Sequence, residues 1–180
     1  MQASFNFIAP RERQRFAAAF AFLLTALALL AGCAAAPPKP TLAQRQAATL
    51  SKLGFKKIED GWLLILPDRI SFEFNKDDLK PEFRKTIADF AHELLNVDIR
   101  QLRVEGHTDN VGVHDYNITL SQRRADVVAD AFVADGFAAK DVARKGLGPD
   151  HPAADNDTPE GRAQNRRVEI IVVSSALATP

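Results

Sequence analysis

Two charged residues, Asp109 and Arg124, have the types and positions needed to bind a ligand that carries both an amine and a carboxylate. Asp109 follows the segment from Leu102 to His107, in which apolar and polar residues alternate as in a strand with one buried face. The alternation predicts that His107, Thr108 and Asp109 fall at the end of a strand.

Arg124 lies inside the apolar stripe of a helix that we expect from Asn117 to about Gly136. The stripe consists of Leu120, Val127, Val128 and Ala131. A guanidinium that faces a protein core is costly unless it meets an anion, and the nearest candidate in the sequence is Asp109. We therefore predict that Asp109 and Arg124 lie opposite each other. Arg123 falls nearer the edge of the stripe, where its long stem can reach water.

The elements around this segment predict an α/β fold. Helices are expected at Leu42–Leu53, after Pro81, and after Thr158, which has the type and position of an N-cap. Strands are expected at Trp62–Leu66, Ile70–Phe74, Val142–Gly146 and Arg167–Val173, the first two paired and the last in the sheet interior. The order predicts helices packed on a mixed sheet of four or five strands.

The first 32 residues have the layout of a secretory signal. Three arginines precede an uncharged run from Phe16 to Gly32, which is shorter than the roughly 20 residues that span a bilayer. Leu30 to Cys33 resembles the bacterial lipobox, which implies cleavage before Cys33, acylation of its thiol, and anchoring in outer-membrane lipid because Ala34 rather than Asp follows. Residues 33–41 then form a proline-rich tether, 42–61 a helical lead-in, 62–173 the folded domain and 174–180 a loose tail.

The charge and cysteine content exclude two classes of protein. Without residues 1–32 the net charge is −2, because three arginines and one glutamate lie in that segment, so no basic surface for nucleic acid is implied. Cys33 is the single cysteine of the sequence, so an apolar core rather than a disulfide must hold the fold.

Several blocks, in the same order, resemble the OmpA-like C-terminal domain, a peptidoglycan-binding module. They are GHTDNVG from Gly106, YN from Tyr116, LSQRRA from Leu120 and NDTPEGRAQNRRVEI from Asn156. The resemblance covers about Trp62 to Val173. It implies that the chain binds the diaminopimelate of the cell-wall peptide without a covalent bond and tethers the outer membrane to the wall.

By the same resemblance, Asp109 receives the ammonium of the ligand and Arg124 its carboxylate. Thr108, Asn117, Leu120, Phe74 and Asn75 are expected to line the same ligand-binding site. The sequence departs from the family pattern at Val113 and His114, where relatives have small polar residues, and at Asn75, where Asp is common.

Other functions are weaker readings of the same residues. Within cell-envelope proteins, the alternative is a peptidoglycan-associated lipoprotein of the Tol system, which needs a further protein-binding surface; a flagellar stator relative would keep its membrane helix. A hydrolase would use His107, Asp109 and His114 as zinc ligands, or Ser121 as a nucleophile. The first set has too few ligands and the second lacks a Gly-x-Ser-x-Gly turn, so we expect no enzyme, cofactor or metal.

The basic cluster Asn165–Arg167 lies near Asp155, Asp157 and Glu160 in the sequence. It either forms a solvated ion network that fixes the long loop beside the last strand or contacts the ligand directly. We leave it out of the residues expected to bind the ligand.

Overall fold

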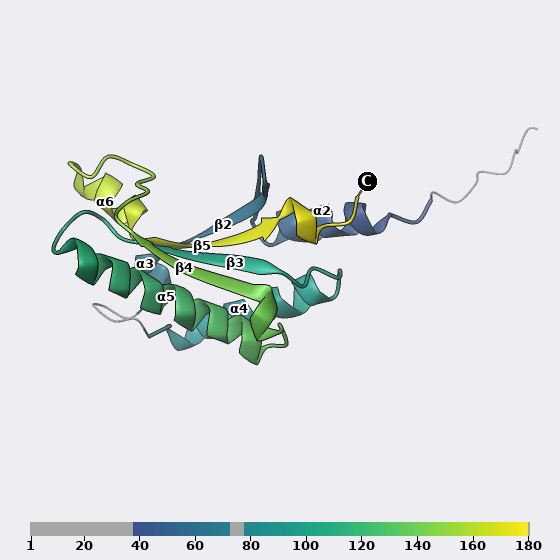
Figure 1. Ribbon diagram of the computed structural model, residues 1–180. Coiled ribbons are helices and arrows are strands. Elements are labelled where there is room, and N and C mark those ends of the chain that lie inside the picture. The colour runs from purple at the N-terminus through teal and green to yellow at the C-terminus, as the bar shows by residue number, and fades with distance from the viewer. Residues whose placement is uncertain (1–37, 73–77, 180) are drawn as a thin grey trace, which may run out of the picture. The chain divides into compact units, whose positions relative to one another are not determined.

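The computed structural model describes residues 38–72 and 78–179, and its centre is a mixed five-stranded sheet (Figure 1). The strands are β1 (Lys56–Ile58), β2 (Gly61–Pro67), β3 (Leu102–His107), β4 (Val142–Gly148) and β5 (Arg167–Val173). Their order in the sheet is β1-β2-β5-β3-β4, with β3 and β4 parallel and all other neighbours antiparallel. The predicted fold class is therefore confirmed.

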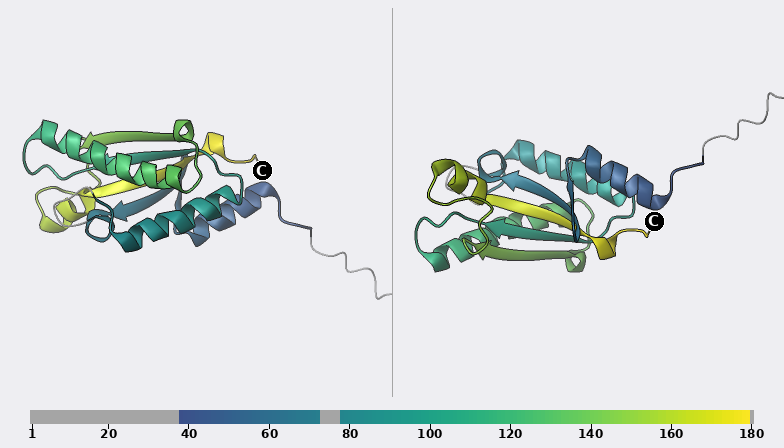
Figure 2. Two further views of the ribbon diagram at one scale, coloured as in Figure 1. Left: turned by 90° about the horizontal axis from the view of Figure 1, so that it is seen from below. Right: turned by 90° about the horizontal axis from the view of Figure 1, so that it is seen from above.

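Two long helices, α4 (Pro81–Leu95) and α5 (His114–Ala134), lie side by side across one face of the sheet (Figure 2). Their inward residues repeat at helical spacing. In α4 the buried residues are apolar, whereas α5 also buries Asn117, Ser121 and Arg124. Fully buried side chains between the helices and the sheet include Ile87, Leu94, Val104, Val128 and Phe132. This layer is the core that holds the strand ends in place.

Two shorter helices lie at opposite ends of the sheet (Figure 1). α2 (Leu42–Lys52) begins at a capping box in which Thr41 and Gln44 each bind the backbone of the other. α6 (Pro159–Asn165) begins where the Thr158 hydroxyl accepts a hydrogen bond of 3.0 Å from the Gly161 amide. Both predicted helix starts are confirmed.

Helix α5 approaches the sheet so closely that two glycines are required beneath it. A Cβ at Gly106 in β3 would lie 2.0 Å from the Ser121 carbonyl oxygen, and one at Gly146 in β4 would lie 2.4 Å from the Gln122 nitrogen. Hydrogen bonds join the two layers at the same place, from the Gly146 amide to Gln122 Oε1 and from the Gly148 amide to Ser121 Oγ. The position of Arg124, one turn further along α5, is thereby fixed relative to β3.

The predicted strand at Ile70–Phe74 is wrong over its first residues. Asp68–Ser71 form a single helical turn, α3, closed by a hydrogen bond from the Phe72 amide to the Asp68 carbonyl. The alternation of apolar residues resembles a strand, but local hydrogen bonds turn the chain at Asp68 and Ser71. The strands that pair with β2 are β1 and β5, so the predicted pairing of this segment with Trp62–Leu66 is also wrong. Phe72 forms one isolated bridge with Leu79, and Phe74 lies outside the described residues.

Three smaller expectations also change. The short strand β1 was not predicted, and α5 begins at His114 rather than Asn117. The segment after β5 is less loose than expected, because Ser174–Ala176 form a 3-10 turn, Leu177 packs against the core, and the Ala178 amide donates to Gln46 Oε1.

The predicted signal peptide, lipobox and Cys33 fall in residues 1–37, outside the described part of the chain. Within residues 38–72 and 78–179, none of the helices combines the length and apolar character needed to cross a membrane.

Candidate ligand-binding site

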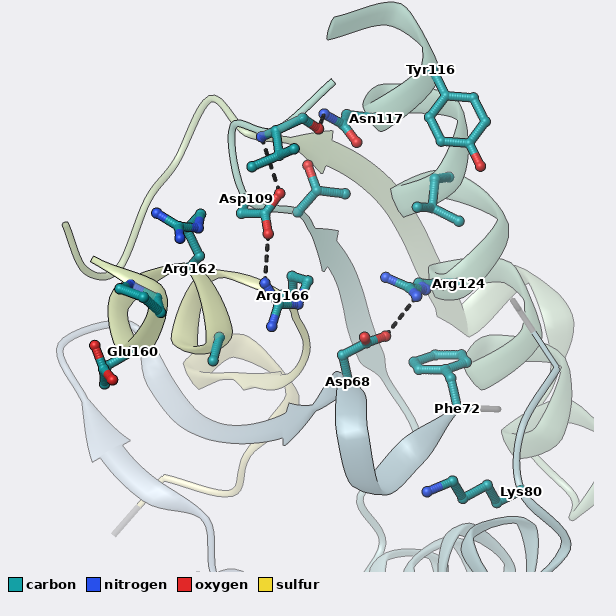
Figure 3. Close-up of a pocket in the computed structure, with 15 residues that line it drawn as sticks. Asp68, Phe72, Lys80, Asp109, Tyr116, Asn117, Arg124, Glu160, Arg162 and Arg166 are labelled. Carbon is teal, nitrogen blue, oxygen red and sulfur yellow. Dashed lines mark hydrogen bonds and ion pairs between the residues drawn. The ribbon is translucent and has the colours of Figure 1, made fainter. Parts of the chain in front are cut away.

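A pocket of about 1130 Å³ opens at the edge of the sheet where β2 and β3 end and β5 begins (Figure 3). Because β5 runs antiparallel to both neighbours, its first residue lies at the same edge as their last residues. This topology brings together Asp68 after β2, Asp109 after β3 and Arg166 before β5. Helices α5 and α6 supply further walls.

The pocket is lined mainly by polar and charged side chains, with a few apolar ones. The lining residues are Asp68, Phe72, Lys80, Thr108, Asp109, Val111, Tyr116, Asn117, Leu120, Arg124, Pro159, Glu160, Arg162, Ala163 and Arg166.

Arg124 is paired with an anion, as its place in the apolar stripe requires, but the anion is Asp68. Arg124 Nη2 lies 2.7 Å from Asp68 Oδ1, and the guanidinium carbon lies 5.1 Å from the centre of the Phe72 ring. The predicted Asp109–Arg124 pair is therefore wrong. Arg124 is ten residues into α5, about 15 Å along the helix axis from its first residue, and there the helix faces the end of β2.

Asp109 forms its own pair with Arg166. Arg166 Nη1 donates to Asp109 Oδ2 over 2.6 Å, while Asp109 Oδ1 accepts from the Val111 amide over 3.1 Å. The two pairs are connected through the backbone, because the Asp68 amide donates to the Arg166 carbonyl over 3.0 Å. Arg166 is not among the residues expected to bind the ligand, yet it lines the pocket.

The four charges of Asp68, Arg124, Asp109 and Arg166 act on one another. Burial raises the pKa of Asp68, the guanidiniums of Arg124 and Arg166 lower it, and the Asp109 carboxylate raises it, with a net upward shift. Asp68 thus feels both guanidiniums and the second carboxylate. Two anions and two cations at one pocket wall suit a ligand end that carries one charge of each sign.

Five of the residues expected in the site line this pocket: Thr108, Asp109, Asn117, Leu120 and Arg124. The Asn117 amide group donates to the Val111 carbonyl over 2.9 Å and so fixes the loop after Asp109. Thr108 lines the pocket, and its buried hydroxyl makes no hydrogen bond to any part of the chain that the structure describes. Phe74 and Asn75 lie outside the described residues.

Sequence reasoning missed Asp68, Phe72 and Arg166, together with Lys80, Glu160 and Arg162 at the pocket walls. A signal for two of them exists: Asp68 is the first charged residue after one apolar strand, and Arg166 is the last before another. Only the order of the strands, however, places those ends at one edge.

The rest of the basic cluster has the structural role that was considered for it. Asn165 Oδ1 accepts from the amides of Ala153 and Ala154, and Arg167 Nε lies 2.7 Å from Glu169 Oε1. These contacts hold the loop before α6 against the start of β5.

The residues considered for hydrolysis are engaged elsewhere. The Ser121 hydroxyl is fully buried, donates to the Ile118 carbonyl over 2.8 Å and accepts from the Gly148 amide, so it joins α5 to the sheet rather than lying at the surface or at the helix end. His114 lies 2.8 Å from Asp150, and hydrogen bonding to that carboxylate raises the pKa of His114.

His107 belongs to a different group, on the face of the sheet turned away from α4 and α5. Its Nε2 lies 3.8 Å from Glu169 Oε2, and Glu105 is directly opposite Glu169 in the sheet register. Burial alone would raise the pKa of Glu169, but His107 and Arg167 lower it to about 2. Among the residues described, this group of Glu105, His107 and Glu169 includes neither Asp109 nor His114, so the three residues considered as zinc ligands do not form one site.

A family model described as the OmpA family matches residues 71–166, which include β3, α5, β4 and α6. The chain belongs to the OmpA family. The match covers the loop that holds Asp109, the helix that holds Arg124, and Arg166 at its end.

Three proteins that are similar to this OmpA-family chain have names that refer to the cell envelope. The chain is 45% identical over 143 residues to an outer-membrane lipoprotein, YfiB, of Pseudomonas aeruginosa, across 79% of this chain and 85% of that protein. It is 53% identical over 103 residues to the peptidoglycan-binding protein ArfA of Mycobacterium bovis, across 57% of this chain but only 32% of ArfA. The solved cell wall anchor of the T6SS from Pseudomonas aeruginosa superposes with a TM-score of 0.59 at 30% identity, covering 76% of this chain and 99% of that one.

Proposed function

We propose that this OmpA-family chain binds peptidoglycan without a covalent bond and tethers the outer membrane to the cell wall. The observation that carries the proposal is the pocket wall on which Asp68, Asp109, Arg124 and Arg166 present two charges of each sign. The Thr108 hydroxyl beside them has no hydrogen-bond partner among the residues described. The end of a diaminopimelate side chain, with an ammonium and a carboxylate on one carbon, has the charges to match.

In this proposal Asp109 accepts the ammonium of diaminopimelate and Arg124 binds its carboxylate. Thr108, Asn117 and Leu120 line the space around the ligand, and Phe74 and Asn75 remain assigned to the pocket by family resemblance. The names of the relatives support the ligand class, since one is named as peptidoglycan-binding and one solved structure as a cell wall anchor.

The membrane end of the tether is the acylated Cys33 of the lipobox. Similarity to a protein named as an outer-membrane lipoprotein supports association with the outer membrane. Acylation of Cys33 and exposure of the folded domain on the periplasmic face complete the proposal. No surface among the described residues singles out a Tol protein as partner, so the Tol alternative is not carried further.

The proposal is tested with the mature chain carrying Cys33→Ser, so that no lipid interferes, mixed with purified cell-wall sacculi and sedimented. The protein with an otherwise wild-type sequence should sediment with the sacculi. Asp109→Asn should weaken its affinity for sacculi at least tenfold, because a charge-assisted hydrogen bond contributes about 1.5 to 3 kcal/mol. Thermal melts verify that both proteins are folded. Equal retention of a folded Asp109→Asn variant would remove Asp109 from the ligand site, and breakdown of the wall would indicate an enzyme.

A further inference from the structure

Each of the two charges proposed to bind the ligand already has a partner of opposite sign within the protein. Asp68 Oδ1 lies 2.7 Å from Arg124 Nη2, in the position that a ligand carboxylate would take. Arg166 Nη1 lies 2.6 Å from Asp109 Oδ2, in the position that a ligand ammonium would take. The ligand must therefore displace these partners or share the two central charges with them.

The two partners meet at the same strand edge. The Asp68 amide donates to the Arg166 carbonyl, and Figure 3 shows the Asp68 carboxylate between the guanidiniums of Arg124 and Arg166. All four side chains line one pocket, and the exposed fractions of the Asp68 and Arg124 side chains are 19% and 6%. At such burial an unbalanced charge is costly.

The charge balance has different consequences for different ligands. A ligand with a carboxylate but no amine would place a second anion beside Asp68 on one guanidinium. A ligand with an amine but no carboxylate would place a second cation beside Arg166 on one carboxylate. A zwitterionic end avoids both, because its ammonium can face Asp68 and Asp109 while its carboxylate faces Arg124 and Arg166.

We infer that Asp68 and Arg166 are specificity determinants. They balance the charges of Arg124 and Asp109, so that the wall formed by these four side chains accepts a zwitterion and rejects a simple anion or a simple cation. The inference rests on the proposed function and deepens it, because it assigns discrimination to residues other than the two proposed to hold the ligand.

The remaining charged lining residues lie outside the two ion pairs. Lys80 has the weakest effect of the charges that act on Asp68, and Arg162 donates to the Asn156 carbonyl over 2.8 Å. Glu160 is exposed at the start of α6. These residues contribute to the general field of the pocket but form no ion pair with Asp109 or Arg124 among the described contacts.

The test uses three small molecules that share one carbon chain: meso-diaminopimelate, pimelate, which lacks the amines, and cadaverine, which lacks the carboxylates. Each is titrated into the mature protein by NMR. The wild type should bind diaminopimelate at least tenfold more tightly than either analogue.

Two variants remove one partner each. Asp68→Asn should bind pimelate at least fivefold more tightly than the wild type and cadaverine no better. Arg166→Gln should show the reverse, with a gain for cadaverine only. Asp130→Asn is the matched control, because Asp130 is an exposed carboxylate that pairs with Arg144 and does not line the pocket. It should leave the ratio of the three affinities unchanged.

Each failure has a separate meaning. If the wild type binds neither diaminopimelate nor sacculi, the proposed function is wrong. If the wild type binds diaminopimelate but the folded Asp68→Asn and Arg166→Gln variants keep wild-type discrimination, only the specificity assignment is overturned. Should Asp68→Asn fail to fold, the result for Arg166→Gln alone decides whether the specificity assignment holds. It tests the same charge balance by removing a positive partner instead of a negative one.

Discussion

At the scale of single residues, the sequence predicts that Arg124 needs a buried anion but does not identify which one. The helical wheel places Arg124 among apolar neighbours, and the side chain is indeed buried. Asp109 is closer to Arg124 in the sequence, whereas Asp68 lies in the helical turn α3 that follows β2. Ion-pair partners in a sheet protein depend on strand order, which a local pattern does not contain.

Replacement of Arg124 by lysine should weaken sacculus binding at least tenfold. A planar guanidinium binds a carboxylate through two parallel hydrogen bonds, whereas an ammonium cannot. Arg123→Lys is the neighbouring control and should bind as the wild type does, because Arg123 does not line the pocket. Sedimentation with sacculi measures both variants, and equal losses in the two would contradict a specific role for Arg124.

The stability contributed by Glu169 should depend on pH. Its pKa is lowered from 4.5 to about 2, so the ionised carboxylate stabilises the folded state above pH 4.5, and that stability is lost as the pH falls toward 2. Glu169→Gln should reduce the free energy of unfolding by roughly 2 kcal/mol at pH 7. The difference from the wild type should shrink in urea denaturation curves between pH 4.5 and 3; a constant difference would refute the assignment.

At the scale of elements, patterns with a clear period predicted the structure and ambiguous ones did not. The alternation of apolar and polar residues in β3 predicted a strand correctly, because its side chains point alternately toward the core and away from it. The apolar run of β5 also predicted a strand correctly, because most of its residues are buried. Ile70, Phe72 and Phe74 also alternate, yet the chain turns into α3 after Pro67. Local hydrogen bonds at Asp68 and Ser71 determine the conformation of that segment, and a pattern of apolar residues does not predict such bonds.

Gly106→Ala should destabilise the fold by about 3 kcal/mol, because the new Cβ would lie 2.0 Å from the Ser121 carbonyl oxygen and force α5 away from β3. Binding to sacculi should fall as well, since α5 holds Arg124. Gly112→Ala is the comparison, because no atom of the described residues lies within 4 Å of a Cβ at this position. Its positive φ of 94° alone costs about 1 kcal/mol. Thermal melts that place the two variants at the same stability would contradict the close approach.

At the scale of the whole molecule, the proposed function requires both a lipid anchor at Cys33 and a wall-binding pocket in the folded domain. Cys33→Ser in the full chain should release the protein from the membrane fraction to the soluble periplasm, because each buried methylene of an acyl chain contributes about 0.8 kcal/mol to membrane binding. Fractionation followed by mass spectrometry is the measurement. An intact segment from Met1 to Gly32 without lipid would contradict the lipobox prediction.

The most direct test of peptidoglycan recognition is calorimetric titration of the mature protein with two wall peptides that differ at one residue, diaminopimelate in one and lysine in the other. Lysine keeps the side-chain amine but lacks the carboxylate beside it. Binding should be at least tenfold tighter for the diaminopimelate peptide, and Arg124→Lys should reduce that preference. Equal affinity of the wild-type protein for the two peptides would contradict recognition of a zwitterion by Asp109 and Arg124.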